Sequence, residues 1–465
     1  MKKIILLLLF GSFVLSMFAK EKDLPNIVFI LSDDQGWNSL SSAMDPAVDG
    51  SKSDFYETPN IDRLMSEGMR FAQSYAPAPV CSPSRHSIQF GISPSKTGVT
   101  YNNTSTKQNC DPKLALANLI KKADGRYATA HFGKWHVSFT SKECGYDISD
   151  GNTGNKTGNL DTNSSDDPKL VYDLSRRANQ FMEERVKVGQ PFFIQISHYA
   201  NHLAFLGSSG MTQKYENKTK GKLHNDVDYA AMNEDLDNGV GMVMSKIKEL
   251  GIEDNTYIFY TADNGYDESK NRLSGVAQRK AWPLSYSKGF VYEGGVRVPF
   301  IVKGPGIEKG TTSYTPVIGY DLMNTFLEIV NPEFEVPQQM EGGSFLGILQ
   351  NRGKGDVKRQ HPFFVFHYPA GAWPSFTAIV KDNYKLDYSW AYDKCYLYHL
   401  DSDISEQNDI SSEFPKISEE LKQLMLSYLD EVNALKPSLQ ELEHDRNGDL
   451  FKKGMGPVSK KKKHF

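Results

Sequence analysis

After its first eighteen residues the chain lacks any long apolar run, and it is poor in cysteine. Four cysteines in 465 residues are too few for a disulfide framework. No stretch after residue 18 is apolar enough to cross a bilayer. Acidic and basic residues are mixed and the formal net charge is −4, which argues against a nucleic-acid partner. There is no internal repeat, and the length suits one large domain with a smaller one.

The N-terminus has the three parts of a secretory signal peptide. Met1-Lys2-Lys3 precedes an interrupted apolar run, and Ala19 offers a small-residue cleavage point. We therefore predict a secreted or periplasmic protein without stable membrane insertion. The expected divisions are a signal peptide (1–19), an N-terminal α/β catalytic domain (24–334), a C-terminal α+β subdomain (335–450) and a disordered basic tail (451–465).

Buried strand patterns alternate with amphipathic helical patterns over the first two thirds of the chain. Apolar, β-rich runs at 26–31, 126–132, 191–197 and 256–262 are typical of parallel strands. We expect an α/β fold with a large, mostly parallel central sheet and helices on both faces. Later runs are short and strand-like, at 363–367, 375–380, 384–387 and 396–400, before a helix at 417–435. They predict a smaller antiparallel sheet with a packed helix.

Acidic residues follow two of the predicted strands. Asp33 and Asp34 come after the first, and Asp263 and Asn264 after the fourth. Ligands bind at the carboxyl ends of strands in open α/β sheets, and Gly36 permits the turn that both aspartates need to reach one ion. Hard oxygen donors without imidazole select Ca²⁺ or Mg²⁺ over zinc, and we favour Ca²⁺. Solvated loop aspartates are the alternative.

A cysteine stands where an apolar segment gives way to a predicted helix. Ser82 suits the N-cap and Pro83 the first helical position. Cys81 would then lie at a helix N-terminus, where free N–H groups favour an anion. Arg85 would follow one turn later as a planar cation for an oxyanion. A structural cysteine in a loop is the alternative.

This region closely resembles the active-site region of type I, formylglycine-dependent sulfatases, members of the alkaline-phosphatase-like superfamily. The matching segments are Glu67-Gly68-Met69-Arg70-Phe71, Tyr75-Ala76-Pro77-Ala78, Cys81-Ser82-Pro83-Ser84-Arg85, Gly133-Lys134-Trp135-His136, Lys288-Gly289 and Leu397-Tyr398-His399-Leu400-Asp401-Ser402-Asp403. The resemblance runs from Pro25 to about Asp409. It implies that a formylglycine-generating maturation enzyme oxidises Cys81 to an aldehyde, whose hydrate attacks a sulfate ester.

The resemblance also implies roles for the matching side chains. Arg85, Lys134 and Lys288 would neutralise the sulfate oxygens. His202 would protonate the leaving oxygen, and His136 would take a proton from residue 81 so that sulfate leaves. The Ca²⁺ would be held by Asp33, Asp34, Cys81 after modification, Asp263 and Asn264.

Two assignments stay open at this point. His198 competes with His202, because the family has proline two residues after its histidine and this chain has Ala204. With Cys81 modified, at most one disulfide can form, and Cys110 with Cys144 is one option.

An aromatic segment from His367 to Trp373 follows the strand-like run that ends at Phe366. Such rings suit stacking on a sugar face, and we expect His367 and Trp373 to bind the leaving sugar of a sulfated carbohydrate. Packing at the domain interface is the alternative.

Two other functions remain open. A phosphodiester or phosphonate monoester hydrolase of the same superfamily can use the same nucleophile. The family continues after its arginine with Thr-Gly-Arg, and this chain has Phe90-Gly91-Ile92. An unmatured protein that binds a sulfated glycan without hydrolysing it is therefore the other alternative.

Overall fold

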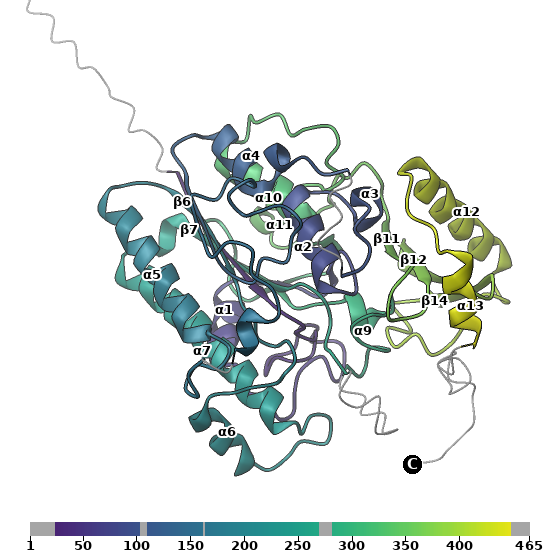
Figure 1. The fold of residues 1–465 in the computed structure, drawn as a ribbon, viewed down its shortest axis with the longest axis horizontal. Helices are drawn as coiled ribbons and strands as arrows, with labels where there is room; N and C mark the ends of the chain where they lie inside the picture. Colours follow the sequence, from purple (N-terminus) through teal and green to yellow (C-terminus); the bar gives the residue numbers. More distant parts are fainter. Residues whose placement is uncertain (1–23, 103–108, 161–162, 269–280, 448–465) are drawn as a thin grey trace, which may run out of the picture.

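The computed structural model describes residues 24–102, 109–160, 163–268 and 281–447 (Figure 1). The expected signal peptide (1–19) and basic tail (451–465) lie outside the described residues. In the described part of the chain, no helix has both the length and the apolar character needed to span a bilayer.

An eight-stranded sheet forms the centre of the molecule, in the order β5-β4-β6-β1-β7-β8-β2-β9. The strands from β5 to β7 are parallel, and β8 runs antiparallel to both of its neighbours. The predicted mostly parallel α/β sheet is confirmed. Its strands are β1 (Asn26–Ser32), β2 (Met69–Phe71), β4 (Ala128–Gly133), β5 (Ile148–Ser149), β6 (Phe192–Ser197), β7 (Thr256–Ala262), β8 (Phe300–Lys303) and β9 (Thr311–Ser313).

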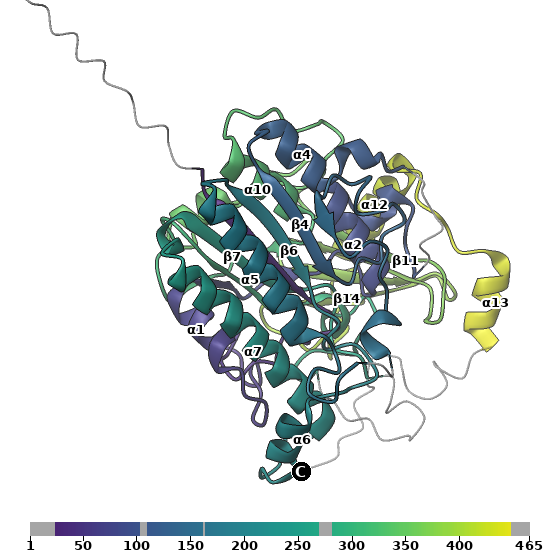
Figure 2. The ribbon, with the colours of Figure 1, turned by 60° about the vertical axis from the view of Figure 1, so that its left-hand side comes forward.

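Helices cover both faces of this sheet (Figure 2). Val28 and Ile30 of β1 pack with α1 (Pro59–Glu67), α5 (Val171–Lys187) and α7 (Val227–Glu249). Ile27 and Phe29 point to the other face and pack with α2 (Cys81–Phe90), α4 (Leu116–Ala123) and α10 (Asp321–Val330). Because both faces are covered, every residue of β1 is buried, which explains its continuous apolar pattern.

The remaining helices and strands of the large layer, with the C-terminal helix, are short. They are α3 (Pro94–Thr97), α6 (Ser209–Glu216), α9 (Glu293–Val296), α11 (Leu346–Gln350), α13 (Leu439–Asn447), and the paired strands β3 (Ser74–Tyr75) and β10 (Val317–Ile318). Helix α11 lies after the expected domain boundary at residue 335, yet Leu346, Ile348 and Leu349 pack in the same core as α10.

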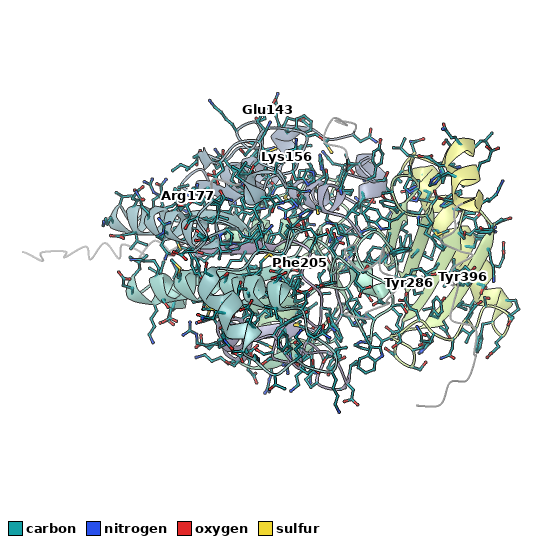
Figure 3. The ribbon with its side chains drawn as sticks, turned by 60° about the horizontal axis from the view of Figure 1, so that its bottom comes forward. Glu143, Lys156, Arg177, Phe205, Tyr286 and Tyr396 are labelled. Carbon is teal, nitrogen blue, oxygen red and sulfur yellow. The ribbon has the colours of Figure 1, made fainter. Side chains whose placement is uncertain are left out.

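A four-stranded antiparallel sheet forms the smaller layer, in the order β11-β12-β13-β14. One face carries α12 (Pro415–Glu431), which lies beyond the small sheet in Figure 1. The other face packs on the large layer, where the rings of Tyr75 and Phe366 are 5.5 Å apart. Figure 3 shows Tyr286 and Tyr396 at this boundary. The strands are β11 (Phe364–Tyr368), β12 (Phe376–Lys381), β13 (Tyr384–Ser389) and β14 (Lys394–His399).

A buried ionic network joins the two layers. The Nζ atom of Lys385, on β13, lies 3.0 Å from Glu293 Oε1 and 2.8 Å from Glu406 Oε1. Arg297 Nε donates to the second oxygen of Glu293 at 2.6 Å. All four side chains are buried. Since an unpaired buried charge is costly, this network holds the small sheet in one position.

We predict that Lys385→Ala destabilises the protein by about 3–5 kcal/mol, because it leaves buried Glu406 without its cation and leaves Glu293 with Arg297 alone. Urea unfolding of both proteins measures the change. The control is Lys381→Ala, which removes a surface ion pair with Asp382 and should change stability by under about 0.5 kcal/mol. Equal effects of the two substitutions would contradict a holding role for Lys385.

Candidate active site

The chain turns sharply where β1 ends, and this turn brings two carboxylates together. Asp263 N donates to Ser32 O at 3.1 Å, so the ends of β1 and β7 lie side by side. Asp34 has φ 52° and occupies the left-handed region, which short polar residues tolerate. The sequence assigned this turn to Gly36. That assignment is wrong, because the change of direction falls at Asp34 itself.

Helix α2 presents residue 81 to these carboxylates. The helix begins at Cys81, with Val80 at the N-cap, so the expected cap at Ser82 is wrong and Pro83 lies at the third helical position. The expected place of Cys81 at a helix N-terminus is confirmed. Its Sγ atom lies 3.4 Å from Asp33 Oδ1 and 3.6 Å from Asp34 Oδ1.

Burial raises the pKa of the Cys81 thiol well above its ordinary value. Lys134 and Lys288 lower this pKa, but by less than burial raises it. Since the thiolate is the nucleophilic form of cysteine, an unmodified Cys81 is a poor nucleophile here.

Three carboxylates pair with three cations in the neighbourhood of Cys81. Lys134 Nζ donates to Asp33 Oδ2 at 2.5 Å, and Lys288 Nζ donates to Asp34 Oδ2 at 2.6 Å. Arg85 Nε donates to Asp263 Oδ2 at 2.7 Å. Each carboxylate thus gives one oxygen to a cation. The remaining oxygens of Asp33 and Asp34 face the Sγ atom of Cys81.

The electrostatics of this cluster suit a divalent cation. Burial raises the pKa of Asp34 and of Asp263 to about 6, against the lowering effects of Lys288 and Arg85. Asp33 is buried too, but Lys134 and neighbouring cations hold its pKa well below the ordinary value. One ligand atom each from Asp33, Asp34, Cys81 and Asp263 lies within 4.8 Å of the others. Asn264 Oδ1 is buried without a hydrogen bond. These hard oxygens fit Ca²⁺ or Mg²⁺.

The two candidate histidines after β6 point in different directions. His202 Nε2 lies 3.8 Å from Asp34 Oδ2, inside the site. His198 is buried against Gly239 of α7, and neither of its ring nitrogens has a hydrogen bond. The structure therefore favours His202. Burial and Lys288 lower the pKa of His202 to about 3.

His136 lies beyond the end of β4, in irregular backbone. It has φ 55°, and its Nδ1 atom is buried without a hydrogen bond. Burial and Lys134 lower the pKa of His136 to about 2. A neutral imidazole with a free nitrogen can accept a proton.

The structure corrects the expected position of His367. This residue lies inside β11 rather than in a loop, and its side chain is buried. Its Nδ1 atom lies 2.7 Å from Thr377 Oγ1, and its Nε2 atom lies 2.7 Å from Leu435 O. Both nitrogens thus make hydrogen bonds within the C-terminal layer, which leaves neither for a sugar.

Trp373 lies beside the site. A Cβ atom built on Gly289 would come within 2.2 Å of the Trp373 ring, and Gly289 has φ +90°. The close contact places this indole next to the residue that follows Lys288.

Asp267 was not predicted from the sequence as a site residue. Its Oδ2 atom lies 3.5 Å from Lys288 Nζ. Asp267 is buried and gives Lys288 a second carboxylate besides Asp34. Its position four residues after Asp263, beyond the end of the same strand, could have indicated a place in the site. Cys110 and Cys144 are both free thiols in the structure, so the disulfide that the sequence left open is not formed in it.

Buried carboxylates, cations and a helix N-terminus at the carboxyl ends of parallel strands are the groups that an enzyme needs to bind an anionic ester. The family model for sulfatases matches residues 25–332, and the model for the C-terminal region of N-sulphoglucosamine sulphohydrolase matches residues 283–432. The chain belongs to the type I sulfatase family of the alkaline-phosphatase-like superfamily, and it is a sulfuric ester hydrolase.

Similar proteins include a sulfatase of Formosa agariphila, 27% identical over 89% of this chain and 90% of the relative. An ulvan-active sulfatase of the same organism is 26% identical over 70% of this chain and 65% of the relative. The crystal structure of Ps i-CgsB in complex with k-i-k-neocarrahexaose has a TM-score of 0.73 at 23% identity, covering 93% of this chain and 98% of that chain.

We predict that added Ca²⁺ raises the melting temperature more at about pH 8 than at about pH 5. Without metal, the raised pKa values of Asp34 and Asp263 mean that these carboxyls stabilise the fold only while protonated. That contribution is lost as pH rises through about 6, whereas the ionised carboxylates are the ligands for Ca²⁺. Differential scanning fluorimetry measures the gain.

Asp33→Ala and Asp263→Ala should lose both this gain and the activity. Asp237→Ala should keep the gain, because it removes a buried carboxylate of α7 that binds Ile61 N at the start of α1. A gain of equal size at both pH values, or in Asp263→Ala, would contradict the metal assignment.

Proposed function

We propose that this sulfatase hydrolyses a sulfate ester on a carbohydrate, with a formylglycine formed from Cys81 and a bound Ca²⁺, in preference to Mg²⁺. The observation that carries the proposal is the cluster of three buried carboxylates, each paired with a cation, beside the buried residue 81. This cluster offers both a place for a divalent cation and cationic groups for a sulfate.

The surroundings of residue 81 support its proposed modification. A thiol with a raised pKa is a poor nucleophile at neutral pH. Oxidised to an aldehyde hydrate, residue 81 would supply a hydroxyl nucleophile that takes the sulfate transiently. A formylglycine-generating maturation enzyme is therefore a required partner.

The carboxylates of Asp33, Asp34 and Asp263, with the free oxygen of Asn264, would hold the metal. When bound, the ion supplies positive charge that lowers the pKa of a nearby hydroxyl and polarises a sulfate oxygen. It would also compensate the carboxylates that Lys134 and Lys288 now neutralise. The two ammonium groups, together with Arg85, then remain to bind the sulfate oxygens.

Two histidines supply the proton transfers. His202 lies near Lys288 and Asp34, where it can give a proton to the oxygen of the leaving sugar. An anionic sulfate ester beside it would raise its pKa toward the useful range. His136, neutral and with a free nitrogen, takes a proton from the second hydroxyl of residue 81, so that sulfate leaves.

Two observations support a carbohydrate as the leaving group. The Trp373 ring lies against Gly289, beside Lys288, and can stack on a sugar face. Among the relatives, the ulvan-active sulfatase is named for a polysaccharide. A secreted or periplasmic location, proposed from the N-terminal sequence, suits polysaccharide degradation.

We predict that protein produced with a maturation enzyme carries formylglycine at position 81 and releases sulfate, and that Cys81→Ala releases none. Mass spectrometry of the peptide that spans residue 81 detects the modification, and ion chromatography measures sulfate. Turnover by Cys81→Ala or by the fully unmodified thiol protein would contradict the mechanism. If residue 81 stays a thiol beside a maturation enzyme, tight binding of sulfated glycans by that unmodified protein without turnover would favour the glycan-binding alternative.

We predict that Trp373→Ala lowers kcat/KM on the best carbohydrate sulfate about tenfold, the equivalent of one stacking contact. The panel contains O-sulfated galactose, glucose, fucose, N-acetylglucosamine and N-acetylgalactosamine, with an aryl sulfate and a phosphodiester for comparison. The matched control is Trp390→Ala, which removes a tryptophan that bonds Thr377 within the small sheet and should leave kcat/KM unchanged. Faster turnover of the phosphodiester than of every sugar sulfate would make the carbohydrate assignment wrong.

A further inference from the structure

His86 lies on α2, the helix that begins at residue 81, and it contacts the segment that carries His136. We infer that His86 is a positioning residue, which fixes the segment 134–138 against α2 and so sets the place of His136 relative to residue 81. The consequence for turnover rests on the proposed function, whereas the structural part does not.

The hydrogen bonds of His86 define its role. Its Nδ1 atom lies 2.8 Å from Ser82 O, and Ser138 N donates to its Nε2 atom at 2.9 Å. A ring nitrogen that accepts an N–H carries no proton, so Nδ1 holds the hydrogen and donates it to Ser82 O. The ring is fully buried, and burial lowers its pKa to about 4. His86 is thus a neutral imidazole with a fixed tautomer.

The two bonded residues are neighbours of the reacting groups. Ser82 follows Cys81 directly, and Ser138 lies two residues after His136. Arg85, the residue before His86, donates from Nη1 to Lys134 O at 2.7 Å. Two consecutive side chains of α2 therefore hold this segment at both of its ends.

The segment needs such support because it has no regular structure. His136 has a positive φ, a conformation that persists in a residue with a side chain only when the surroundings impose it. Trp135 Nε1 donates to Phe139 O at 2.6 Å, which closes the segment on itself. Within the described residues, His86 is the side chain from α2 that anchors its Ser138 end.

Packing reinforces the same connection. The Phe90 ring stacks on His86 with centroids 6.4 Å apart, and it meets Phe139 edge-on at 5.8 Å. Phe90 stands where the family pattern has threonine, so this departure has a packing role in the chain. The polar and apolar contacts of α2 thus meet the same segment.

Two substitutions separate the bond at Nδ1 from the contacts that Ser138 N and Ser138 Oγ make with Nε2. In His86→Gln the amide oxygen reaches the position of Nε2 and can accept the Ser138 N–H, while the bond to Ser82 is lost. In His86→Asn the amide reaches the position of Nδ1 and keeps the bond to Ser82, while the bond to Ser138 is lost. If His86 positions the segment, His86→Gln retains the function and His86→Asn does not.

The first measurement is independent of activity and uses the full chain with Cys81 as thiol. Hydrogen–deuterium exchange of the peptide that covers 134–139 should quicken in His86→Asn and His86→Ala and stay close to wild type in His86→Gln. The control for a general loss of stability is Asp237→Ala. Asp237 lies on α7 and accepts a hydrogen bond from Ile61 N at the start of α1, outside this segment. Equal exchange in the Asn and Gln variants, or the same change in Asp237→Ala, would overturn the inference.

The second measurement uses protein with formylglycine and the panel sugar sulfate that the wild type hydrolyses fastest. Because His136 acts when sulfate leaves, His86→Asn should slow sulfate release about 10- to 100-fold, the cost of misplacing a reacting group by about an ångström. In quenched-flow experiments desulfated sugar should then appear in a burst ahead of sulfate. KM should fall together with kcat, so that kcat/KM for sugar release stays within about twofold of wild type, and His86→Gln should keep kcat within about threefold of wild type.

A variant that raises KM without separating sugar and sulfate release would overturn the positioning of His136. If the wild type hydrolyses no sugar sulfate of the panel, the proposed function fails, and the exchange experiment still decides whether His86 holds the segment.

Discussion

The site depends on the pairing of three buried carboxylates with three cations. No one of these charges is stable alone away from water, and each carboxylate gives one oxygen to an ammonium or guanidinium group. The pairing keeps the residues close together although they come from β1, α2, the end of β4 and the region after β7. A cation that joins the carboxylates frees the positive side chains for an anionic ester. The same pairing therefore stabilises the buried charges and holds the positive side chains ready for a substrate.

The recognition that we propose would draw on both layers. The carboxyl ends of the large sheet supply the charged groups, and the small sheet supplies Trp373 through its contact with Gly289. The Lys385 network fixes one layer on the other. Both contacts cross the same boundary between the layers, so the position of the indole depends on ionic pairs buried in that boundary.

Much of this fold was predictable from the sequence, because the pattern of apolar residues indicates which residues of a strand or helix are buried. The strands around residues 26–31 and 256–262 were found nearly to the residue, since both faces of a parallel strand are covered. The acidic strand ends were found because the aspartates directly follow these apolar runs, and the Cys81 helix was found because Ser82 and Pro83 are typical of a helix start. The turn at Asp34 was misplaced because glycine is the usual sign of such a turn, and here a polar residue adopts the left-handed conformation.

Other features could not be read from the chain alone. Whether His198 or His202 reaches the site depends on the direction the backbone takes after β6. The burial of His367 depends on its bond to Leu435, far along the chain. Asp267 and Lys385 act through partners that only the tertiary structure brings together. His86 gave no signal, because a histidine inside a helix has no characteristic meaning until both of its partners are known.

The burial of Cys81 has a consequence for the order of events during synthesis. Its side chain has no exposed surface, and it lies beneath carboxylates that are held in place by the pairing of β1 with β6 and β7. Both partner strands are made long after residue 81 leaves the ribosome. An enzyme that oxidises this residue must therefore act on a chain that is still extended, and the time available ends when β7 joins the sheet.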